Sequence, residues 1–304
     1  MNKELKEELF NQLSEYCSVL VDEPMSKHTS FKIGGPADIF VRPTNSDNLM
    51  KVLNISAQRQ LPVMIMGNGT NLIVRDKGIR GLVIQITDNM SAYGIEGEDI
   101  VAEPGILLSR LSRIALDQEL SGLEFAEGIP GTLGGAVTMN AGAYDGEMSF
   151  IVRQVEYLRS NGQICMLNNE QLCFSKRSSL VQSDSGVVLR TRISLKRGER
   201  ENIAAKMSEF RAKRREKQPL ELPSAGSIFK RPEGYFAGKL IQDCGLRGYR
   251  IGGAEVSGLH CGFIVNKGNA TAEDVTSLIK YVQDKVLADF GVQLNLEVKI
   301  VGEE

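Results

Sequence analysis

Helical patterns of apolar and polar residues occur in five stretches of the chain. The stretches predicted to be helices are 3–20, 47–60, 106–122, 200–219 and 272–290. The third is expected to stop at Gly122, and the fourth, which becomes increasingly basic, at Pro219. The last is the best delimited, because Thr271 is a suitable N-cap, Asp274 completes a capping-box arrangement and Gly291 follows as a C-cap.

Short apolar or alternating runs between these helices predict strands. "RQVEYLRSNGQICML" (153–167) alternates on both sides of Asn161-Gly162, the preferred pair for a type I′ turn, and therefore predicts a β-hairpin. The other predicted strands are 63–67, which suits a buried position, 81–86, 186–195 and 292–302. Strand and helix alternate in the first part of the chain, which is typical of a small α/β unit. A linker to a second unit is expected within 196–220.

The length and charge of the chain limit its possible functions. With 304 residues it can form two or three domains around a well-buried core. Its net charge of −2 gives no global electrostatic case for nucleic-acid binding. No apolar signal region is present, and no run approaches the ~18 apolar residues of a membrane helix. We expect a cytoplasmic protein with no nucleic-acid or membrane partner and no obligatory protein partner.

The cysteines and histidines argue against a metal site. The chain has five cysteines without a CxxC pair, and only two histidines. The expectation is therefore reduced thiols and no bound metal.

Two glycine-rich segments are candidates for contact with a ligand. "GNGTN" (67–71) directly follows a predicted strand, an arrangement that exposes consecutive backbone N–H groups to an anion. "EGIPGTLGGAVTMNAGAYDGE" (127–147) is rich enough in glycine for a flat, rigid ligand to lie against its backbone. No lysine follows in the P-loop position, so a P-loop is excluded. A simple tight turn in the first segment and a closely packed loop in the second are the alternatives.

A set of motifs extends these observations. The motifs are "HTSFKIGGPAD", "GNGTNLIV", "GLEFAEGIPGTLGGAVTMNAGAY", "KRSS", "KQP", "AGSIFKRP", "HCGFIVNKGNATA" and "LEVKIVG". In this order they resemble the UDP-N-acetylenolpyruvoylglucosamine reductase family over nearly the whole chain. The compact middle region, which lacks a long inserted tyrosine-bearing loop, resembles the shorter type II subfamily.

The resemblance implies a mixed α+β (α/β) fold. A p-cresol-methylhydroxylase-type FAD-binding region of two α/β subdomains would be followed by a C-terminal α+β substrate-binding domain. The implied boundaries are 1–90 for the first FAD-binding subdomain with its N-terminal helix, 91–204 for the second, and 205–304 for the substrate-binding domain.

FAD is the implied cofactor, bound non-covalently, because neither histidine lies in a family motif for flavin attachment. "GNGTN" would hold the FAD pyrophosphate, and the second glycine-rich segment would extend along the cofactor toward the flavin. The implied cofactor-binding residues are Gly67, Asn68, Gly69, Thr70, Asn71, Gly128, Pro130, Gly131, Thr132, Gly135, Asn140 and Ala141.

The implied reaction is NADPH-dependent reduction of UDP-N-acetyl-3-O-(1-carboxyvinyl)-glucosamine to UDP-N-acetylmuramate in peptidoglycan precursor synthesis. Hydride delivered from the flavin N5 would leave a carbanion that needs a cation at the substrate carboxylate and a proton donor. Arg177 in "FSKRSS" matches the family's carboxylate-polarising arginine, whose guanidinium is always charged. Ser227 in "AGSIFK" matches the proton donor, and Glu297 in "LEVKIVG" matches the acidic partner near the carboxylate.

Other residues have weaker matches. The "KQP" context of Lys217 implies contact with the substrate diphosphate, whereas the other basic residues of 211–219 are expected to form a solvated helix end. Arg231 occupies a position where some family members carry a substrate-binding asparagine. His260 and Asn266 lie in a family segment, with structural hydrogen bonding in a packed loop as the alternative.

Two departures from the family pattern and two other functions remain open. Lys176 stands where a tyrosine is common, and it could meet a phosphate or point to solvent. Glu127 replaces a commonly small residue or cysteine, and no catalytic meaning is attached to it. An FAD-dependent oxidase of the same fold and a non-catalytic flavin- or nucleotide-binding protein are the alternatives to the reductase.

Overall fold

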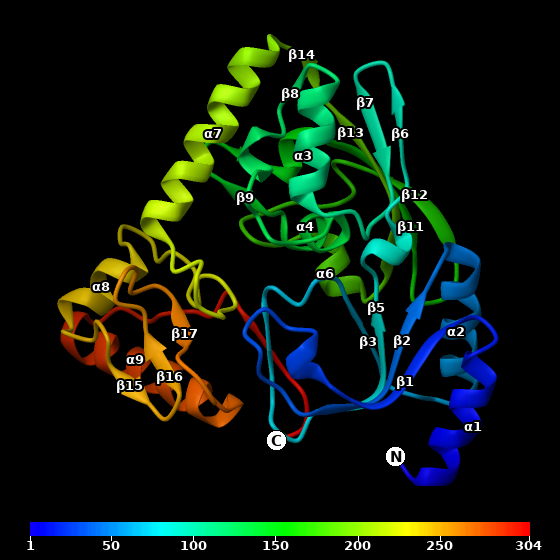
Figure 1. The fold of residues 1–304 in the computed structure, drawn as a ribbon, viewed down its shortest axis with the longest axis horizontal. Coiled ribbons are helices and arrows are strands. Elements are labelled where there is room, and N and C mark those ends of the chain that lie inside the picture. Colours follow the sequence, from blue (N-terminus) through cyan, green and yellow to red (C-terminus); the bar gives the residue numbers. More distant parts are fainter.

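The N-terminal unit is built on a four-stranded sheet with the strand order β1-β2-β5-β3. The computed structural model describes residues 1–304. The elements of this unit are α1 Lys3–Leu13, β1 Cys17–Pro24, β2 Pro36–Pro43, α2 Ser46–Gln58, β3 Val63–Met66 and β5 Ile79–Gln85. β1 is antiparallel to β2, and the other pairs are parallel. Apolar residues of α1 and α2, which lie at the right of Figure 1, share a buried core with the sheet.

The predicted helix over 47–60 and the predicted strands over 63–67 and 81–86 are confirmed. However, β3 is not the buried strand that its sequence suggested. It lies at the edge of the sheet, and Val63 is exposed.

The prediction of one helix over 3–20 is wrong beyond Leu13. Residues 17–24 instead pair with β2 along the full length of both strands, from Cys17 opposite Pro43 to Pro24 opposite Pro36. This ladder uses the backbone groups that a longer helix would need, so tertiary pairing overrides the local helical pattern.

The central unit contains a five-stranded antiparallel sheet with the order β12-β11-β13-β7-β6. Its strands are β6 Tyr93–Glu96, β7 Asp99–Ala102, β11 Val152–Leu158, β12 Ile164–Asn168 and β13 Val187–Ser194. Its helices are α3 Leu108–Asp117, α4 Leu133–Met139, α5 Met148–Ile151, α6 Leu180–Asp184 and α7 Arg200–Lys217. Short pairs join β8 Leu120–Ser121 to β14 Lys196–Arg197 and β9 Gly142–Ala143 to β10 Gly146–Glu147. A buried core of 25 residues fills the unit.

The predicted hairpin is confirmed as β11 and β12, but its turn is not of type I′. That turn requires a positive φ at both central residues, and of Asn161 and Gly162 only the glycine has one. The Asn161 side chain instead accepts a hydrogen bond from the Gln163 amide. The expected helix over 106–122 also ends early, at Asp117, because Leu120 and Ser121 pair with β14. The strand over 186–195 and the helix over 200–219 are confirmed.

The C-terminal unit has a three-stranded sheet, β15-β16-β17, covered by two helices (Figure 1). Its elements are α8 Ala237–Asp243, β15 Arg250–Ile251, β16 Ala254–Val256, β17 Ile264–Asn266 and α9 Ala272–Phe290. The prediction for α9 is confirmed in detail, since Thr271 and Asp274 form the capping box and Gly291 ends the helix at φ 68°. No helix in the chain has both the length and the apolar character required to cross a membrane.

The end of the chain leaves the C-terminal unit and returns to the N-terminal unit. The strand predicted over 292–302 is reduced to β18 Lys299–Val301, which pairs in parallel with β4 Leu72–Val74. The preceding residues are extended but form only isolated contacts, such as the bridge between Phe229 and Leu296. Their partner is therefore the loop before α8 rather than a continuous strand.

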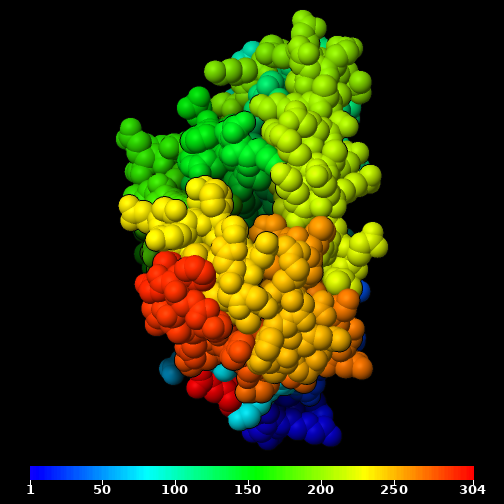
Figure 2. Space-filling model, turned by 90° about the vertical axis from the view of Figure 1, so that its left-hand side faces the viewer, coloured from blue at the N-terminus to red at the C-terminus, as the bar shows by residue number.

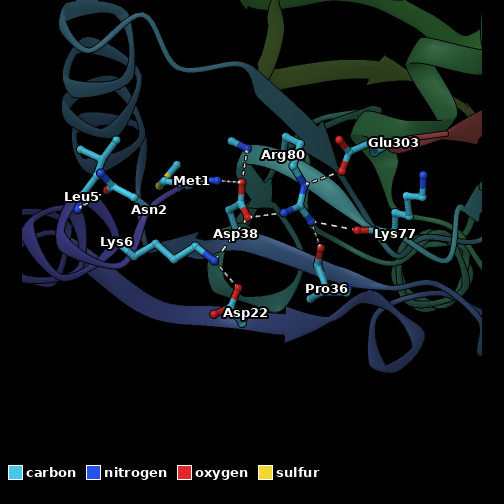
Figure 3. Close-up of polar contacts among 11 residues, drawn as sticks. Met1, Asn2, Leu5, Lys6, Asp22, Pro36, Asp38, Lys77, Arg80 and Glu303 are labelled. Atoms are coloured by element: carbon cyan, nitrogen blue, oxygen red, sulfur yellow. Dashed lines mark hydrogen bonds and ion pairs between the residues drawn. The ribbon is translucent and has the colours of Figure 1, made fainter.

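A buried carboxylate holds α1 against the N-terminal sheet. Asp38 of β2 is 1% exposed and accepts hydrogen bonds from Arg80 Nη1 at 2.7 Å and from the Gly81 amide at 3.0 Å. Lys6 of α1 reaches the same carboxylate at 3.4 Å (Figure 3). Burial raises the pKa of Asp38, but the Gly81 amide, Arg80 and Lys6 outweigh it and hold that pKa below its ordinary value.

Replacing Asp38 by asparagine should lower the free energy of unfolding at neutral pH by about 2–4 kcal/mol, because Lys6 and Arg80 lose their buried carboxylate and keep only the exposed Asp22 and Glu303. A carboxylate with a depressed pKa stabilises the fold above its unfolded pKa and loses this effect as the pH falls through its folded pKa. The difference between wild type and Asp38→Asn should therefore shrink below pH 3.8, the ordinary Asp value. Urea unfolding at several pH values measures it. Asp117→Asn, at an exposed ion pair with Arg200, is the control and should change little.

Candidate active site

The loop Gly67–Asn71 presents five backbone amides that donate no hydrogen bond to any protein atom. The loop follows β3 and packs closely on residues 28–29, where a Cβ on Gly69 would lie 2.1 Å from the His28 carbonyl oxygen. Gly69 itself adopts φ 63°, a conformation that favours glycine. Consecutive free N–H groups on a strand-to-turn connection form an anion-binding concavity, so the loop fits a pyrophosphate.

The second glycine-rich segment lies directly beside this loop. Asn68 Nδ2 donates to the Pro130 carbonyl at 3.0 Å, and a Cβ on Gly67 would lie 2.3 Å from Thr132 Oγ1. The amides of Gly131, Thr132 and Gly135 also donate to no protein atom. A Cβ on Gly131 would meet only Thr70 Oγ1 within 4 Å, at 3.7 Å. Open space and free amides around Gly131 and Gly135 fit a bound cofactor. The other glycines of the segment are closely packed, as the alternative expected: Gly128, Gly134, Gly142 and Gly146.

Asn140 and Ala141 have a different environment from these glycines. Asn140 is 1% exposed at φ 42°, and its Nδ2 donates to Glu147 Oε1 at 3.0 Å and to the Ser175 carbonyl at 3.1 Å. Its Oδ1 accepts from the Ser149 amide. The side chain is therefore fully engaged within the protein, and the expected cofactor contact at this position stays a prediction.

Arg177 and Glu297 are brought together from distant parts of the sequence. Arg177 Nε donates to Glu297 Oε1 at 2.9 Å, and the two side chains are 31% and 22% exposed. A tight turn between Ser175 and Ser178, closed by two backbone hydrogen bonds, presents the arginine. Arg177 has φ 58°, a left-handed conformation that is strained for a residue with a Cβ and that is often found at functional sites.

Ser227 lies on the segment next to Glu297. The Glu297 amide donates to the Ile228 carbonyl at 2.8 Å, and Ile228 directly follows the serine. Ser227 bridges Phe263 on its other side. Its half-buried hydroxyl makes no hydrogen bond within the protein and is free for a substrate. The three residues expected to be catalytic thus share one region, although they come from three separate segments.

Lys176, Arg231 and Lys217 lie around this region with different degrees of constraint. Lys176 Nζ donates to the Arg231 carbonyl at 3.2 Å, a partner that the sequence did not suggest. The Arg231 guanidinium stacks 3.9 Å over the Phe236 ring and donates to the Tyr235 carbonyl. Lys217 is exposed at the last position of α7. Figure 2 shows a hollow bounded by the green surface of the central unit, the yellow-green surface of α7 and the yellow-orange C-terminal unit.

His260 and Asn266 have the structural roles that formed the alternative at the sequence level. Asn266 donates to the Phe31 carbonyl, while its Oδ1 accepts from the Gly268 and Ala270 amides. His260 Nδ1 accepts from the Gly262 amide at 3.1 Å. Burial lowers the pKa of His260, which favours the neutral ring that this hydrogen bond requires.

The expectation of a solvated helix end holds for Arg215, which is exposed, but is wrong for Arg214. Arg214 is 8% exposed, and its Nε donates to the Glu127 carbonyl at 3.0 Å. Arg211 donates through Nε to Glu127 Oε1 at 2.9 Å, and Ser112 donates to Oε2. Glu127 is therefore a buried anchor at the start of the second glycine-rich segment. A glutamate before a glycine-rich loop and a run of arginines elsewhere were the only sequence signals, and they did not indicate that these residues meet.

Two regions of the chain match known protein families. Residues 37–168, which contain both glycine-rich segments, match the family described as "FAD binding domain". Residues 218–301 match the family described as "UDP-N-acetylenolpyruvoylglucosamine reductase, C-terminal domain". The fold, the free amides and these matches define the chain as an FAD-binding oxidoreductase.

More particularly, the chain belongs to the UDP-N-acetylenolpyruvoylglucosamine reductase family. The reductase of Alkaliphilus oremlandii (strain OhILAs) is 53% identical over 94% of each chain. That of Clostridioides difficile (strain 630) is 48% identical over 100% of this chain and 99% of the relative. The crystal structure of the Thermus caldophilus reductase aligns with a TM-score of 0.81 at 34% identity, covering 93% of this chain and 98% of that one. The resemblance, the mixed α/β fold, the FAD cofactor and a reductase function in peptidoglycan precursor synthesis are thereby confirmed.

Replacing Arg214 by alanine should lower the free energy of unfolding by about 2–3 kcal/mol, because the Glu127 carbonyl loses a buried charged donor. The neighbouring Arg215 is exposed and makes no hydrogen bond or ion pair, so Arg215→Ala is a matched control that should change little. Urea unfolding of the FAD-loaded proteins measures both. Equal losses in the two variants would contradict the role assigned to Arg214.

Proposed function

We propose that the protein uses NADPH to reduce UDP-N-acetyl-3-O-(1-carboxyvinyl)-glucosamine to UDP-N-acetylmuramate. The observation that carries this proposal is the contact between Arg177 and Glu297 on the segment adjacent to Ser227. Bound FAD would supply the redox chemistry, which is hydride transfer between NADPH and the vinyl group of the substrate. The protein residues must then hold the substrate carboxylate and protonate the neighbouring carbon.

Arg177 is proposed to bind the substrate carboxylate. Its Nε is occupied by Glu297, so the two terminal nitrogens of the guanidinium remain for the ligand. A planar, permanently charged fork suits the carboxylate as negative charge from the carbanion spreads onto it. Glu297 orients this fork, and its second carboxylate oxygen is free to act nearby.

Ser227 is proposed to donate the proton. A serine hydroxyl is a weak acid, so it serves here only toward a strongly basic carbanion in close contact. Its hydroxyl has no partner within the protein, and Gly226 before it, at φ 78°, shapes the turn that presents it. These features support the role without requiring any further acid.

The remaining contacts are proposed from position and chemistry. Lys217 and Arg231 would bind the substrate diphosphate and its surroundings, since both are exposed cations. The amides of 67–71 and of Gly131, Thr132 and Gly135 would bind FAD, with Gly128, Pro130, Asn140 and Ala141 along the same path. A cytoplasmic location, where UDP-sugars and NADPH are made, follows from this chemistry.

We also propose that the chain works as three units, 1–90, 91–204 and 205–304. The separate sheets support this division, although the cores extend across it: Leu158 and Val187 pack in the N-terminal core, and Phe31 packs in the C-terminal one. The last boundary falls inside α7, whose Phe210 belongs to the core of the central unit. The helix therefore packs on the central unit, and Lys217 lies at its C-terminal end, next to the start of the C-terminal unit.

Replacing Ser227 by alanine should leave FAD content and flavin reduction by NADPH unchanged, but slow flavin reoxidation by the substrate by at least about 100-fold. Stopped-flow absorbance of the two half-reactions separates these steps. A variant that reoxidises at the wild-type rate would remove Ser227 from the mechanism. A wild-type protein that oxidises NADPH equally without the substrate would instead indicate an oxidase.

Replacing Gly131 by valine should lower FAD content without unfolding the protein. A Cβ at this position would meet only Thr70 Oγ1, at 3.7 Å, and Gly131 has no positive φ, so we expect the valine side chain to collide with the cofactor rather than to strain the fold. Gly94→Val is the control, because that glycine also has open space around it but lies in β6. The flavin-to-protein absorbance ratio measures the effect, and equal ratios would place the cofactor elsewhere.

A further inference from the structure

The side chain of Asn71 contacts the segment of Glu297. Its Nδ2 donates to the Glu297 carbonyl oxygen at 3.1 Å. The nearest other polar partner of this amide is the sulfur of Met139, at 3.9 Å. The Asn71 side chain thus binds a carbonyl of the C-terminal segment, although Asn71 belongs to the loop that is expected to bind the cofactor.

The backbones of the two segments are joined at the same place. The Lys299 amide donates to the Asn71 carbonyl at 2.9 Å, and the pairing of β4 with β18 begins at the next residue, Leu72. Asn71 therefore forms two hydrogen bonds that bracket residues 297–299. Because the Glu297 amide donates to Ile228, the peptide groups on both sides of Glu297 are held.

We propose that Asn71 is a positioning residue that sets the carboxylate of Glu297, and through it Arg177, from the cofactor loop. This inference rests on the proposed function of Glu297 and Arg177. Its physical basis is that the Glu297 side chain reaches Arg177 Nε at 2.9 Å from a backbone whose carbonyl only Asn71 fixes by a side-chain hydrogen bond. A shift of about 1 Å at such a site can cost about 100-fold in rate.

The proposal separates Asn71 from the other residues of its loop. The amides of Gly67–Asn71 face the cofactor in the proposed function, whereas the Asn71 side chain acts on the substrate side. Removing that side chain should therefore affect the step that uses the substrate and not the binding of FAD. If the Asn71 side chain instead bound the FAD pyrophosphate, its removal would weaken FAD binding and leave the substrate step unchanged.

The test uses FAD-loaded Asn71→Ala. Flavin reoxidation by the substrate should slow about 10- to 100-fold, while FAD affinity, measured by flavin fluorescence, and flavin reduction by NADPH stay close to wild type. Substrate binding, followed by the change in the flavin spectrum without reductant, should weaken less than the rate falls. A larger loss in rate than in substrate binding would indicate that Glu297 and Arg177 are displaced, rather than that a contact with the substrate is lost.

The matched control is Asp76→Ala. Asp76 lies two residues after β4 and accepts hydrogen bonds from the Ala272 and Glu273 amides at 2.9 and 3.0 Å. It also joins the N-terminal unit to the C-terminal unit, but it does not touch the Glu297 segment. Its loss should reduce stability and leave flavin reoxidation nearly unchanged.

Two results would overturn the proposal. One is a fall in FAD affinity of Asn71→Ala with an unchanged substrate step, which would make Asn71 a cofactor ligand. The other is an equal slowing of flavin reoxidation in Asn71→Ala and Asp76→Ala, which would show that any weakening of the contact between the N-terminal and C-terminal units has this effect. Should the alanine variant fail to fold, Asn71→Ser, whose side chain is too short to reach the carbonyl, serves instead. Failure of the proposed function would be seen separately, as a wild-type flavin that the substrate does not reoxidise.

Discussion

The return of the chain to its own N-terminal unit is the constraint on which the active site depends. The three residues Lys299–Val301 pair in parallel with Leu72–Val74 and so fix Glu297 relative to the loop before β4. Arg177 belongs to the central unit and Ser227 to the C-terminal unit, and no hydrogen bond joins the two residues directly. Glu297 connects them, because its side chain contacts Arg177 and its amide donates to Ile228, the residue after Ser227.

A common arrangement supports the three segments that carry the proposed catalytic residues. A side chain from the N-terminal or the central unit donates a hydrogen bond to a backbone carbonyl in or beside each segment. Asn140 donates to Ser175, next to the Arg177 turn, and Ser30 donates to Ser224 at 2.6 Å, three residues before Ser227. Asn71 donates to Glu297 itself. Three side-chain hydrogen bonds to backbone carbonyls therefore link the proposed cofactor-binding units to the segments proposed to contact the substrate.

Local physics explains which parts of the fold could be predicted from the sequence. The helix Ala272–Phe290 is defined by its own caps, and the β11–β12 hairpin by its own alternation, so both were predicted. Residues 17–20 have a helical pattern but pair with residues 40–43 of the next strand, and local periodicity contains no information on that partner.

The same limit applies to the site. The motif resemblance indicated Arg177, Ser227 and Glu297, and the structure places them in one region. Sequence could not show that Arg214 is buried against Glu127, or that the Asn71 side chain turns to the C-terminal segment. Both depend on contacts between segments more than 80 residues apart, as the separations of 87 and 226 residues show.

The free amides of Gly67–Asn71 have a thermodynamic consequence for the whole protein. These groups donate to no protein atom, so a cofactor bound there, as proposed, would add interactions to the folded state that the unfolded chain cannot offer. By mass action, free FAD at about 100 times its dissociation constant would add about 2.7 kcal/mol to stability. The folded population of the enzyme is then tied to the flavin supply of the cell, and flavin shortage would reduce its abundance as well as its turnover.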